Sequence, residues 1–276
     1  MAKNNDFTVN IDYIKKNYPD FLGLAKKFES DGYVIINLNL SEDFCNSIKE
    51  SVILHLSKNA VKKNPDIYHY NVNPRIIEGW EFCKEIKELA LNKKVVSTLE
   101  ILYDAKSLPF STINFIRGTE QPMHSDYIHF GSKPELYLAG AWVALEDINP
   151  DSGPLGIVKK SHKSPIVFFE DIGFDNFPRN IKEVKNYYSA YEEYLKEYIK
   201  KNKLEIEYPR LKRGDCLIWQ ANLFHGASKI NNSDLTRWAQ VTHYHFQNCS
   251  SFYNPNFSSR KKNIYAKRDV NISRIK

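Results

Sequence analysis

The feature that most constrains the fold is a change in hydrophobic spacing near residue 107. Upstream, apolar residues recur every four positions over residues 44–56, which is typical of a helix with one buried face. Downstream, the chain passes to short apolar and β-branched runs separated by turn signals such as Asp151-Ser-Gly-Pro154, a pattern typical of strands. A helical first part followed by a block of strands predicts a mainly β core with flanking helices.

The first hundred residues also contain a short strand and several helix boundaries. The turn signal Asp31-Gly32 precedes a β-branched run at residues 33–38, which we expect to be a strand. Ser41 can then cap a helix, since a serine side chain accepts a hydrogen bond from the first turn. A second helical stretch runs from Trp80 to Leu102, and Asn92 is expected to divide it in two.

The strand-like runs predict a double-stranded β-helix, the jelly roll of cupin-like proteins, which folds two sheets together. The runs are Phe110 to Arg117, Met123 to Phe130, Leu136 to Leu145, Cys216 to Phe224 and Arg237 to Phe246. We therefore predict a single domain over residues 1–276. Its expected parts are a mainly helical segment (1–106), a jelly-roll core (107–163 and 205–248), a helical insertion (164–204) and a basic tail (249–276).

The insertion is rich in lysine and tyrosine. Its residues 181–201 are predicted to form one helix, with tyrosines spaced three and four apart. We favour a helix that packs on the barrel by its aromatic face. The alternative is a lid over the mouth of a pocket, because long connections within compact domains often serve as lids.

Composition restricts the class of protein. The chain has 276 residues, 42% of them hydrophobic and 26% charged, which is ordinary for a globular protein. No apolar run is long enough to span a bilayer, and the N-terminus lacks the features of a signal peptide, so we expect a cytoplasmic protein. The four cysteines are widely spaced, form no CxxC motif and are expected to be reduced thiols.

The net charge of +6 lies largely in the tail from Arg260 to Lys276. Nucleic-acid binding requires a basic stripe with a reading element, and the sequence contains none that we recognise. The charge therefore favours solubility, or the recruitment of an anionic small-molecule substrate. The sequence gives no indication of the oligomeric state.

Four residues carry the strongest chemical signal. His124 and Asp126 are two apart, so on a strand they would point to the same face. His225 follows a distant apolar strand and would complete two imidazoles and one carboxylate around a metal, the facial triad of non-haem Fe(II) oxygenases. Arg237, twelve residues further on, suits a dicarboxylate co-substrate because its planar guanidinium grips a carboxylate with two hydrogen bonds.

Over roughly residues 107–246, the chain resembles the phytanoyl-CoA dioxygenase family of Fe(II)/2-oxoglutarate oxygenases. Three stretches carry the resemblance: Gln121-Pro-Met-His-Ser-Asp126, residues 141–155 leading to Ser161-His162, and Arg213 to Gly226 with Arg237. The resemblance implies a jelly-roll core with His124, Asp126 and His225 as iron ligands. It also implies that Arg237 holds the distal carboxylate of 2-oxoglutarate, with Gln121 and Trp142 close to that co-substrate.

The chain departs from the family pattern at two positions. Many relatives carry a serine two residues after the distal histidine, where this chain has Ala227 followed by Ser228. The hydroxyl that assists Arg237 is therefore expected from Ser228 or from elsewhere. Lys159-Lys160 stands where relatives have Pro-Gly before Ser-His, so the turn there is expected to differ.

The other histidines are weaker candidates. His129 could reach substrate, but a structural hydrogen bond is at least as well supported. His243 and His245 share strand parity with Arg237, so one of them could face the barrel interior, although we favour a filling role. His69 lies in a polar aromatic loop of the kind that can line a pocket, and we favour a structural role for it.

The sequence thus predicts an Fe(II)- and 2-oxoglutarate-dependent dioxygenase. With O2 as the other co-substrate, it is expected to hydroxylate an unactivated C–H bond of a small metabolite and to release succinate and CO2. Desaturation and epimerisation remain open. One rival is a cupin-type isomerase or lyase, which usually has more histidines in its site and no need for an arginine placed like Arg237. The other is a non-catalytic jelly-roll binding protein.

Overall fold

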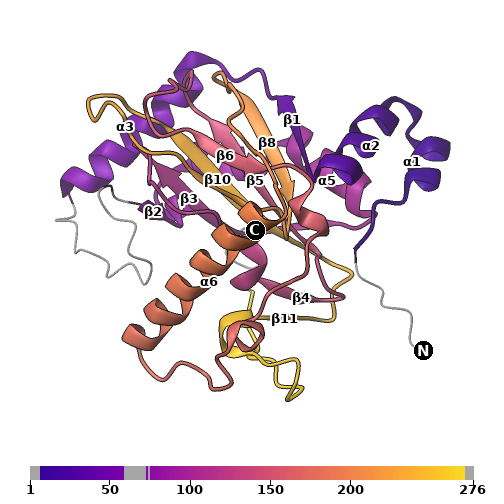
Figure 1. Cartoon of the computed structure of the whole chain (residues 1–276). Helices are drawn as coiled ribbons and strands as arrows, with labels where there is room; N and C mark the ends of the chain where they lie inside the picture. The colour runs from indigo at the N-terminus through magenta and orange to yellow at the C-terminus, as the bar shows by residue number, and fades with distance from the viewer. Residues whose placement is uncertain (1–6, 59–72, 74, 271–276) are drawn as a thin grey trace.

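The computed structural model describes residues 7–58, 73 and 75–270 (Figure 1). The α-helices are α1 (Ile11–Asn17), α2 (Leu22–Asp31), α3 (Glu42–Lys58), α4 (Lys84–Ala90), α5 (Lys93–Tyr103) and α6 (Ile181–Lys201). Short 3-10 helices are η1 (Pro19–Phe21), η2 (Gly79–Glu81), η3 (Asp126–Ile128), η4 (Ser161–Lys163), η5 (Phe169–Ile172) and η6 (Pro255–Phe257).

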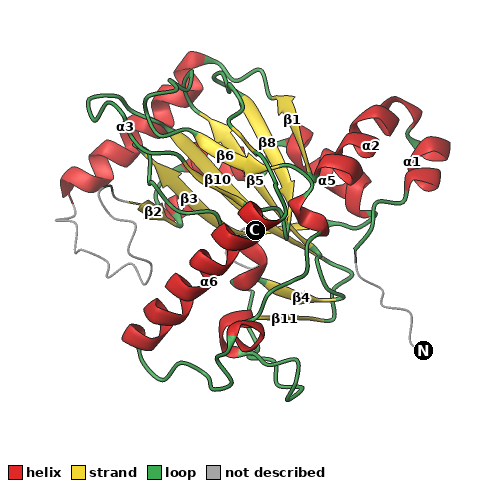
Figure 2. Cartoon of the chain, in the orientation of Figure 1, coloured by secondary structure: helices red, strands yellow, loops and turns green. Residues whose placement is uncertain are grey.

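Eleven strands form three sheets in the described part of the chain (Figure 2). The six-stranded sheet has the order β1-β8-β5-β10-β3-β2, the three-stranded sheet β7-β6-β9, and the two-stranded sheet β11-β4. The strands are β1 (Tyr33–Asn37), β2 (Arg75–Ile77), β3 (Ser107–Phe115), β4 (Gly131–Lys133), β5 (Leu138–Ala144), β6 (Leu155–Val158), β7 (Ile206–Glu207), β8 (Asp215–Gln220), β9 (His225–Ala227), β10 (Ala239–Phe246) and β11 (Ser251–Tyr253). All strand pairs are antiparallel, and the predicted jelly-roll core with flanking helices is confirmed.

The helix boundaries follow from capping. Asn92 accepts hydrogen bonds from the backbone N–H groups of Lys94 and Val95, so the predicted division between α4 and α5 is confirmed. Ser41 accepts from the N–H of Phe44 at 3.2 Å at the start of α3. Both side chains satisfy N–H groups that the first turn of a helix leaves without partners.

Side chains of the large sheet alternate between two cores, because successive residues of a strand point to opposite faces. On β5, Ala141 and Val143 pack against the helical layer, whereas Trp142 between them faces the interior between the sheets. On β8, Ile218 and Trp219 divide in the same way. The helices therefore close one face of the large sheet, and the opposite face is left to form a site with the small sheet.

Two expectations about strands are wrong. The run from Met123 to Phe130 is not a strand: His124 makes an isolated bridge, and the chain then turns into η3. The long run predicted from Cys216 to Phe224 ends at Gln220, and the chain starts a new strand at His225 in the other sheet. In both places the regular strand is interrupted next to a candidate metal ligand. The spacing of apolar residues does not predict such an interruption.

Helix α6 lies across the front of the sheets in Figure 1, above the C-terminal segment. Its buried side chains include Tyr188, Tyr191 and Leu195, which share a core with Ile128 and Phe224. The helix therefore packs by one aromatic and aliphatic face on the loop that carries His124 and Asp126.

The residues after β10 form a folded segment in the structure. Strand β11 pairs with β4, and Tyr253 bridges to Lys267 further along the tail. Ser259 donates to the carboxylate of Glu170, which also accepts the N–H of Arg260 at 2.9 Å. These bonds fix residues 251–268 against the body of the domain.

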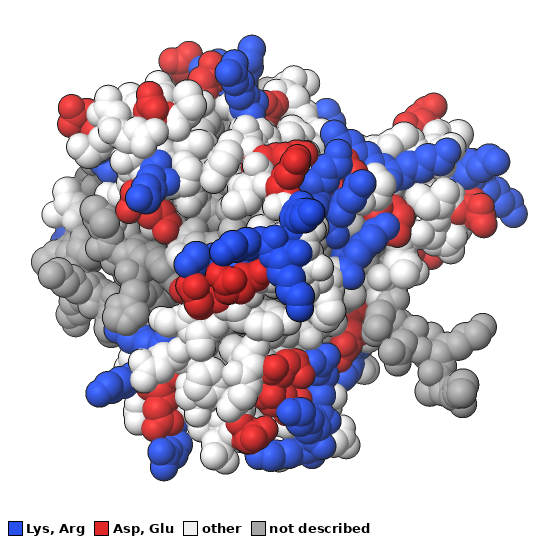
Figure 3. Space-filling view, in the orientation of Figure 1, with Lys and Arg blue, Asp and Glu red and all other residues white. Residues whose placement is uncertain are grey.

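The molecular surface in Figure 3 shows lysine and arginine side chains near α2 and the C-terminal end of α6, with acidic groups interspersed. Among the described residues, none of the helices combines the length and the apolar character that a membrane span requires.

Candidate active site

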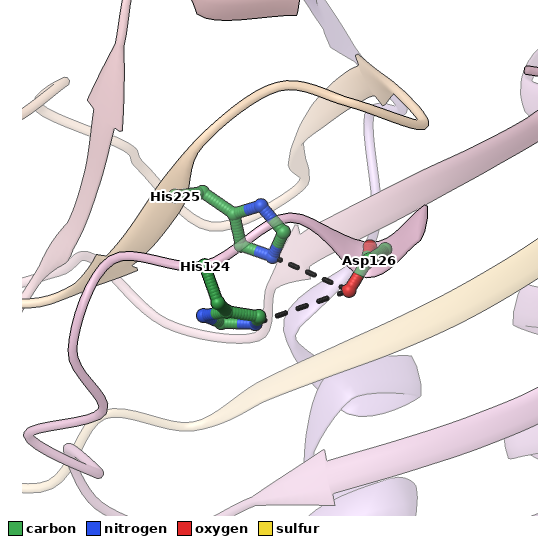
Figure 4. Close-up of side chains that lie close together, drawn as sticks. All are labelled: His124, Asp126 and His225. Atoms are coloured by element: carbon green, nitrogen blue, oxygen red, sulfur yellow. Dashed lines mark ion pairs between the residues drawn. The ribbon is translucent and has the colours of Figure 1, made fainter. Parts of the chain in front are cut away.

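Three side chains converge between the two larger sheets, as the sequence predicts. One ligand atom each from His124, Asp126 and His225 lies within 4.8 Å of the other two, and all three residues are buried. The Nε2 atoms of His225 and His124 lie 3.6 Å and 3.9 Å from Asp126 Oδ1 (Figure 4). Two imidazole nitrogens and one carboxylate oxygen therefore face a common point.

A backbone bridge, not strand parity, brings the two imidazoles together. His124 and His225 exchange both backbone hydrogen bonds, each with an N···O distance of 2.9 Å. In such a pair the side chains lie opposite one another on the same face. Asp126 then joins them because the chain turns into η3, where the hydroxyl of Ser125 accepts the N–H of Tyr127.

Hydrogen bonds fix the tautomer of both imidazoles. His124 Nδ1 lies 3.0 Å from the carbonyl oxygen of Pro122, and His225 Nδ1 lies 3.0 Å from that of Leu223. A carbonyl only accepts, so each Nδ1 carries the proton and each Nε2 presents a lone pair. Burial and the neighbouring His225 hold the pKa of His124 well below its usual range, which keeps this ring neutral.

The carboxylate of Asp126 is oriented through its second oxygen. Trp219 Nε1 donates to Oδ2 at 2.7 Å, and His243 Nε2 lies 3.4 Å from the same atom. Burial alone raises the pKa of Asp126, but the imidazoles of His225 and His243 outweigh it and hold the pKa well below its usual range. An ionised carboxylate beside two imidazole nitrogens is a donor set that fits a divalent transition metal.

Arg237 is a buried cation in the same cavity. Its side chain is 2% exposed, and its guanidinium lies 5.5 Å from the ring centre of Phe115 and 5.8 Å from that of Trp142. One terminal nitrogen donates to the carbonyl of Gly153 at 2.9 Å, whereas Nε has no hydrogen-bond partner among the described residues. Burial and the charge of Arg75 lower the pKa of Arg237 to about 10, so the group stays charged at neutral pH. The site therefore fits an anion opposite this guanidinium.

The triad and Arg237 line one cavity of about 340 Å³. The large sheet contributes Ser111, Ile113, Phe115, Trp142, Trp219, Val241 and His243, and the small sheet contributes Leu155, His225, Gly226 and Ala227. Gln121 also lines it: its amide nitrogen lies 3.1 Å from His124 Nε2, and its amide oxygen accepts from Arg75 at 2.8 Å. The six residues named from sequence thus meet in one place.

Several cavity residues have no sequence signal of their own. Arg75 comes from a three-residue strand, and Asn254 and Arg268 come from the C-terminal segment. His243, for which a filling role is predicted, instead contacts Asp126 and lines the cavity. Its parity with Arg237 was the available signal.

The other histidines lie outside the triad. His129 lines the cavity, but both of its ring nitrogens have hydrogen-bond partners. Its Nδ1 accepts from Asn256 Nδ2 at 3.0 Å, so the proton is on Nε2, which donates to the hydroxyl of Tyr188 at 3.2 Å. His245 is stacked between the rings of Phe110 and Phe252, which agrees with a role in filling the core. His69 lies outside the described residues.

The two departures from the family pattern have structural outcomes. The hydroxyl of Ser228 donates to the carbonyl of Lys229, and the described contacts of Arg237 run to Gly153 instead. Lys160 adopts a left-handed conformation with φ of 69°, which a glycine adopts without strain.

Comparison with known proteins agrees with this geometry. The sequence pattern of the family described as phytanoyl-CoA dioxygenase (PhyH) matches residues 28–239. The chain belongs to the phytanoyl-CoA dioxygenase family. The matched region includes the triad and Arg237, but ends before the C-terminal segment that reaches the cavity. No curated protein sequence matches the chain.

Solved structures share the fold of this family member at low identity. The non-heme alpha ketoglutarate dependent carbocyclase SnoK from nogalamycin biosynthesis is 16% identical, with a TM-score of 0.62 over 90% of this chain and 93% of SnoK. The epimerase SnoN, solved in complex with Fe3+, alpha ketoglutarate and nogalamycin RO, is 16% identical, with a TM-score of 0.59 over 93% and 89% of the two chains. EctD from S. alaskensis, solved with bound Fe, is 18% identical, with a TM-score of 0.62 over 88% and 80%.

Proposed function

We propose that this protein is an Fe(II)- and 2-oxoglutarate-dependent dioxygenase that hydroxylates an unactivated C–H bond of a small-molecule metabolite. The observation that carries the proposal is the combination of a two-histidine, one-carboxylate triad with a buried arginine in one cavity. A triad alone suits several metals and reactions. The added cation favours a dicarboxylate co-substrate and argues against a cupin-type isomerase or lyase.

The triad would hold the iron, and Arg237 would hold the distal carboxylate of 2-oxoglutarate. When bound, iron and 2-oxoglutarate supply an oxidation in which O2 is consumed, the co-substrate becomes succinate and CO2, and the second substrate gains a hydroxyl group. Pro122 and Leu223 keep the imidazoles in the tautomer that presents Nε2.

Two aromatic residues contribute by excluding water. Phe115 and Trp142 flank the guanidinium of Arg237, and Trp142 is 2% exposed. In such a low-dielectric site an ion pair is stronger than in water. Gln121, hydrogen-bonded to Arg75 and close to His124, would orient the co-substrate between the triad and Arg237.

Related enzymes argue for keeping other outcomes in the test. Structures with this fold include a carbocyclase and an epimerase, and both are described as alpha ketoglutarate dependent. We place hydroxylation first because Asp126 is present, whereas halogenases of this chemistry typically lack that carboxylate. Epimerisation and desaturation are the second candidates, since they need the same triad.

The test is a metabolite screen with protein loaded with iron under anaerobic conditions. After air and 2-oxoglutarate are added, succinate release and O2 uptake are measured for each compound, and the masses of the products are determined by mass spectrometry. A gain of one oxygen atom supports hydroxylation. A mass loss of two hydrogens or an unchanged mass, with succinate released, identifies desaturation or epimerisation. Undiminished succinate release by Asp126→Ala would overturn the ligand assignment.

A further inference from the structure

The cavity extends along β3, away from Arg237. The side chains of Phe115, Ile113 and Ser111 line it in a row, because alternate residues of a strand share a face. The guanidinium of Arg237 lies beside Phe115, at one end of this row. Ser111 lies four residues from Phe115, a separation of about 13 Å at roughly 3.3 Å per residue. The cavity therefore has a second end, at Ser111, which the proposed reaction leaves to the primary substrate.

This second end is next to the triad and has apolar walls. Ser111 pairs directly with His243 across the antiparallel strands β3 and β10. His243 Nε2 in turn lies 3.4 Å from Asp126 Oδ2. The ring of Phe130 packs on the ring of His243, with 5.0 Å between the ring centres. Together with Ile113, Phe130 supplies the apolar surface that a carbon skeleton needs close to the metal site.

Ser111 brings a hydroxyl group to the second end. The residue is buried, and its side chain makes no hydrogen bond with any residue that the structure describes. In the neutral ring of His243, the proton is on Nε2, which faces the carboxylate of Asp126, so Nδ1 is an acceptor. This Nδ1 is buried and also has no partner within the described part of the chain. Because side chains of directly opposed residues are neighbours, the hydroxyl proton can turn toward this imidazole, and the hydroxyl oxygen is then left to accept from a ligand.

Asn254 brings amide donors to the same end. It follows Tyr253, which pairs with Gly131, and therefore lies beside Phe130. Its Oδ1 accepts the N–H of Asn256 at 3.0 Å, which fixes the orientation of the amide. Its Nδ2 makes no hydrogen bond with another described residue, although Asn254 lines the cavity. An amide nitrogen only donates, so Asn254 requires an acceptor from whatever occupies the cavity.

We infer that Ser111 and Asn254 bind a hydroxyl group of the primary substrate, so that the substrate class is an alcohol whose apolar carbon skeleton lies against Ile113 and Phe130. The substrate hydroxyl would accept from Asn254 Nδ2 and donate to Ser111 Oγ. A hydroxyl suits this pair because it donates and accepts at one oxygen. The inference rests on the proposed function for the place of the reaction, which is a C–H bond that the skeleton presents to the triad.

The test uses benzyl alcohol as the probe and toluene as its counterpart without a hydroxyl. Both are titrated calorimetrically into protein loaded anaerobically with iron and saturated with 2-oxoglutarate. We expect benzyl alcohol to bind, and Ser111→Ala and Asn254→Ser each to weaken its binding by about threefold to tenfold, the range for one uncharged hydrogen bond. Asn254→Ser removes the amide donors but keeps a side-chain acceptor for the N–H of Asn256. Ser111→Thr, which keeps the hydroxyl, should bind benzyl alcohol more tightly than Ser111→Ala.

Toluene and a second serine provide the controls. Toluene affinity should change by less than about twofold in every variant, because toluene makes neither hydrogen bond. Ser107→Ala is the matched variant: Ser107 is a buried serine of the same strand, its hydroxyl also has no partner among the described residues, and it does not line the cavity. This change should leave the affinity for benzyl alcohol within about twofold of wild type.

The outcomes separate the inference from the proposed function. Undetectable binding of benzyl alcohol, an affinity in Ser111→Ala or Asn254→Ser equal to that of wild type, or an equal loss of toluene affinity would each overturn the inference. Failure of 2-oxoglutarate to bind would instead overturn the proposed function. Binding of benzyl alcohol to the metal-free protein that depends on Ser111 and Asn254 would then still support the alcohol site.

Discussion

Replacing Arg237 with methionine should have opposite effects on co-substrate binding and on the stability of the metal-free protein. The side chain is almost completely buried, and burial together with the charge of Arg75 lowers its pKa to about 10. At about 1.4 kcal/mol per pKa unit, keeping the charge costs the metal-free fold about 3 kcal/mol. This cost is fully present below pH 10 and is relieved as the pH rises above 10.

With 2-oxoglutarate bound, the same charge is paired. Removing one partner of a buried hydrogen-bonded charge pair costs about 2–5 kcal/mol, which corresponds to a rise in Kd of about 30-fold to 4000-fold. The Arg237→Met protein should therefore bind 2-oxoglutarate far more weakly. Its metal affinity should stay unchanged, because the triad does not include Arg237. Arg237→Lys, which keeps the charge but loses the fork, should fall between wild type and Arg237→Met.

Two measurements check this reasoning. Anaerobic calorimetric titration gives the 2-oxoglutarate affinity of the iron-loaded variants, and urea unfolding of the metal-free proteins gives the free energy of unfolding. We expect that free energy to rise in Arg237→Met by up to about 3 kcal/mol, minus the energy with which the guanidinium stacks on Phe115 and Trp142. Unchanged 2-oxoglutarate affinity in a folded, metal-binding variant would refute the assignment of Arg237. A large loss of stability would refute the account of its burial.

Three further changes test individual contacts. Trp219→Phe removes the 2.7 Å hydrogen bond to Asp126 and should weaken metal binding by about 10-fold to 100-fold. A metal titration with a competing chelator measures this affinity, and an unaltered value would mean that the hydrogen bond does not orient the carboxylate. Burial lowers the pKa of His245 to about 3, so the folded protein keeps this ring neutral and loses stability as the pH falls below about 6.5, where the unfolded chain takes up a proton. Between pH 7.5 and pH 5, the free energy of unfolding measured in urea should therefore fall by about 2 kcal/mol more in wild type than in His245→Phe. Parallel pH profiles of the two proteins would contradict this. Tyr191→Phe deletes the hydroxyl that accepts the N–H of Ser125 and should lower the free energy of unfolding by about 1–3 kcal/mol. An unchanged value would show that α6 does not support the loop that carries His124 and Asp126.

The sequence predicts those parts of the fold that have long periodic patterns or a clear capping residue. Helix α6 and the break at Asn92 follow from side-chain spacing and from hydrogen-bonding chemistry. The strands β4, β6 and β11 have three or four residues each, which is too short for an alternating pattern to stand out. Their existence depends on partners far away in the sequence.

The candidate site shows the same division. The triad and Arg237 could be named because their chemistry is specific and their order along the chain matches a family. Arg268 could not, since its placement depends on the pairing of β11 with β4 and on the bridge from Tyr253 to Lys267. His243 was visible through strand parity, but its contact with Asp126 depends on how the metal loop folds across the sheet.

The reciprocal backbone bridge between His124 and His225 bears on when metal can be acquired. The two residues are about a hundred positions apart, so during synthesis the nascent chain holds only two of the three donors, His124 and Asp126, until His225 has left the ribosome. Joining the two segments closes a long loop, which is a slow kind of contact to form. Iron would then bind only after the two sheets have paired. Binding at the triad would stabilise the native state relative to the unfolded chain by mass action. In cells short of iron, a larger fraction of this protein would be in the metal-free, less stable form, and proteases would degrade that form faster.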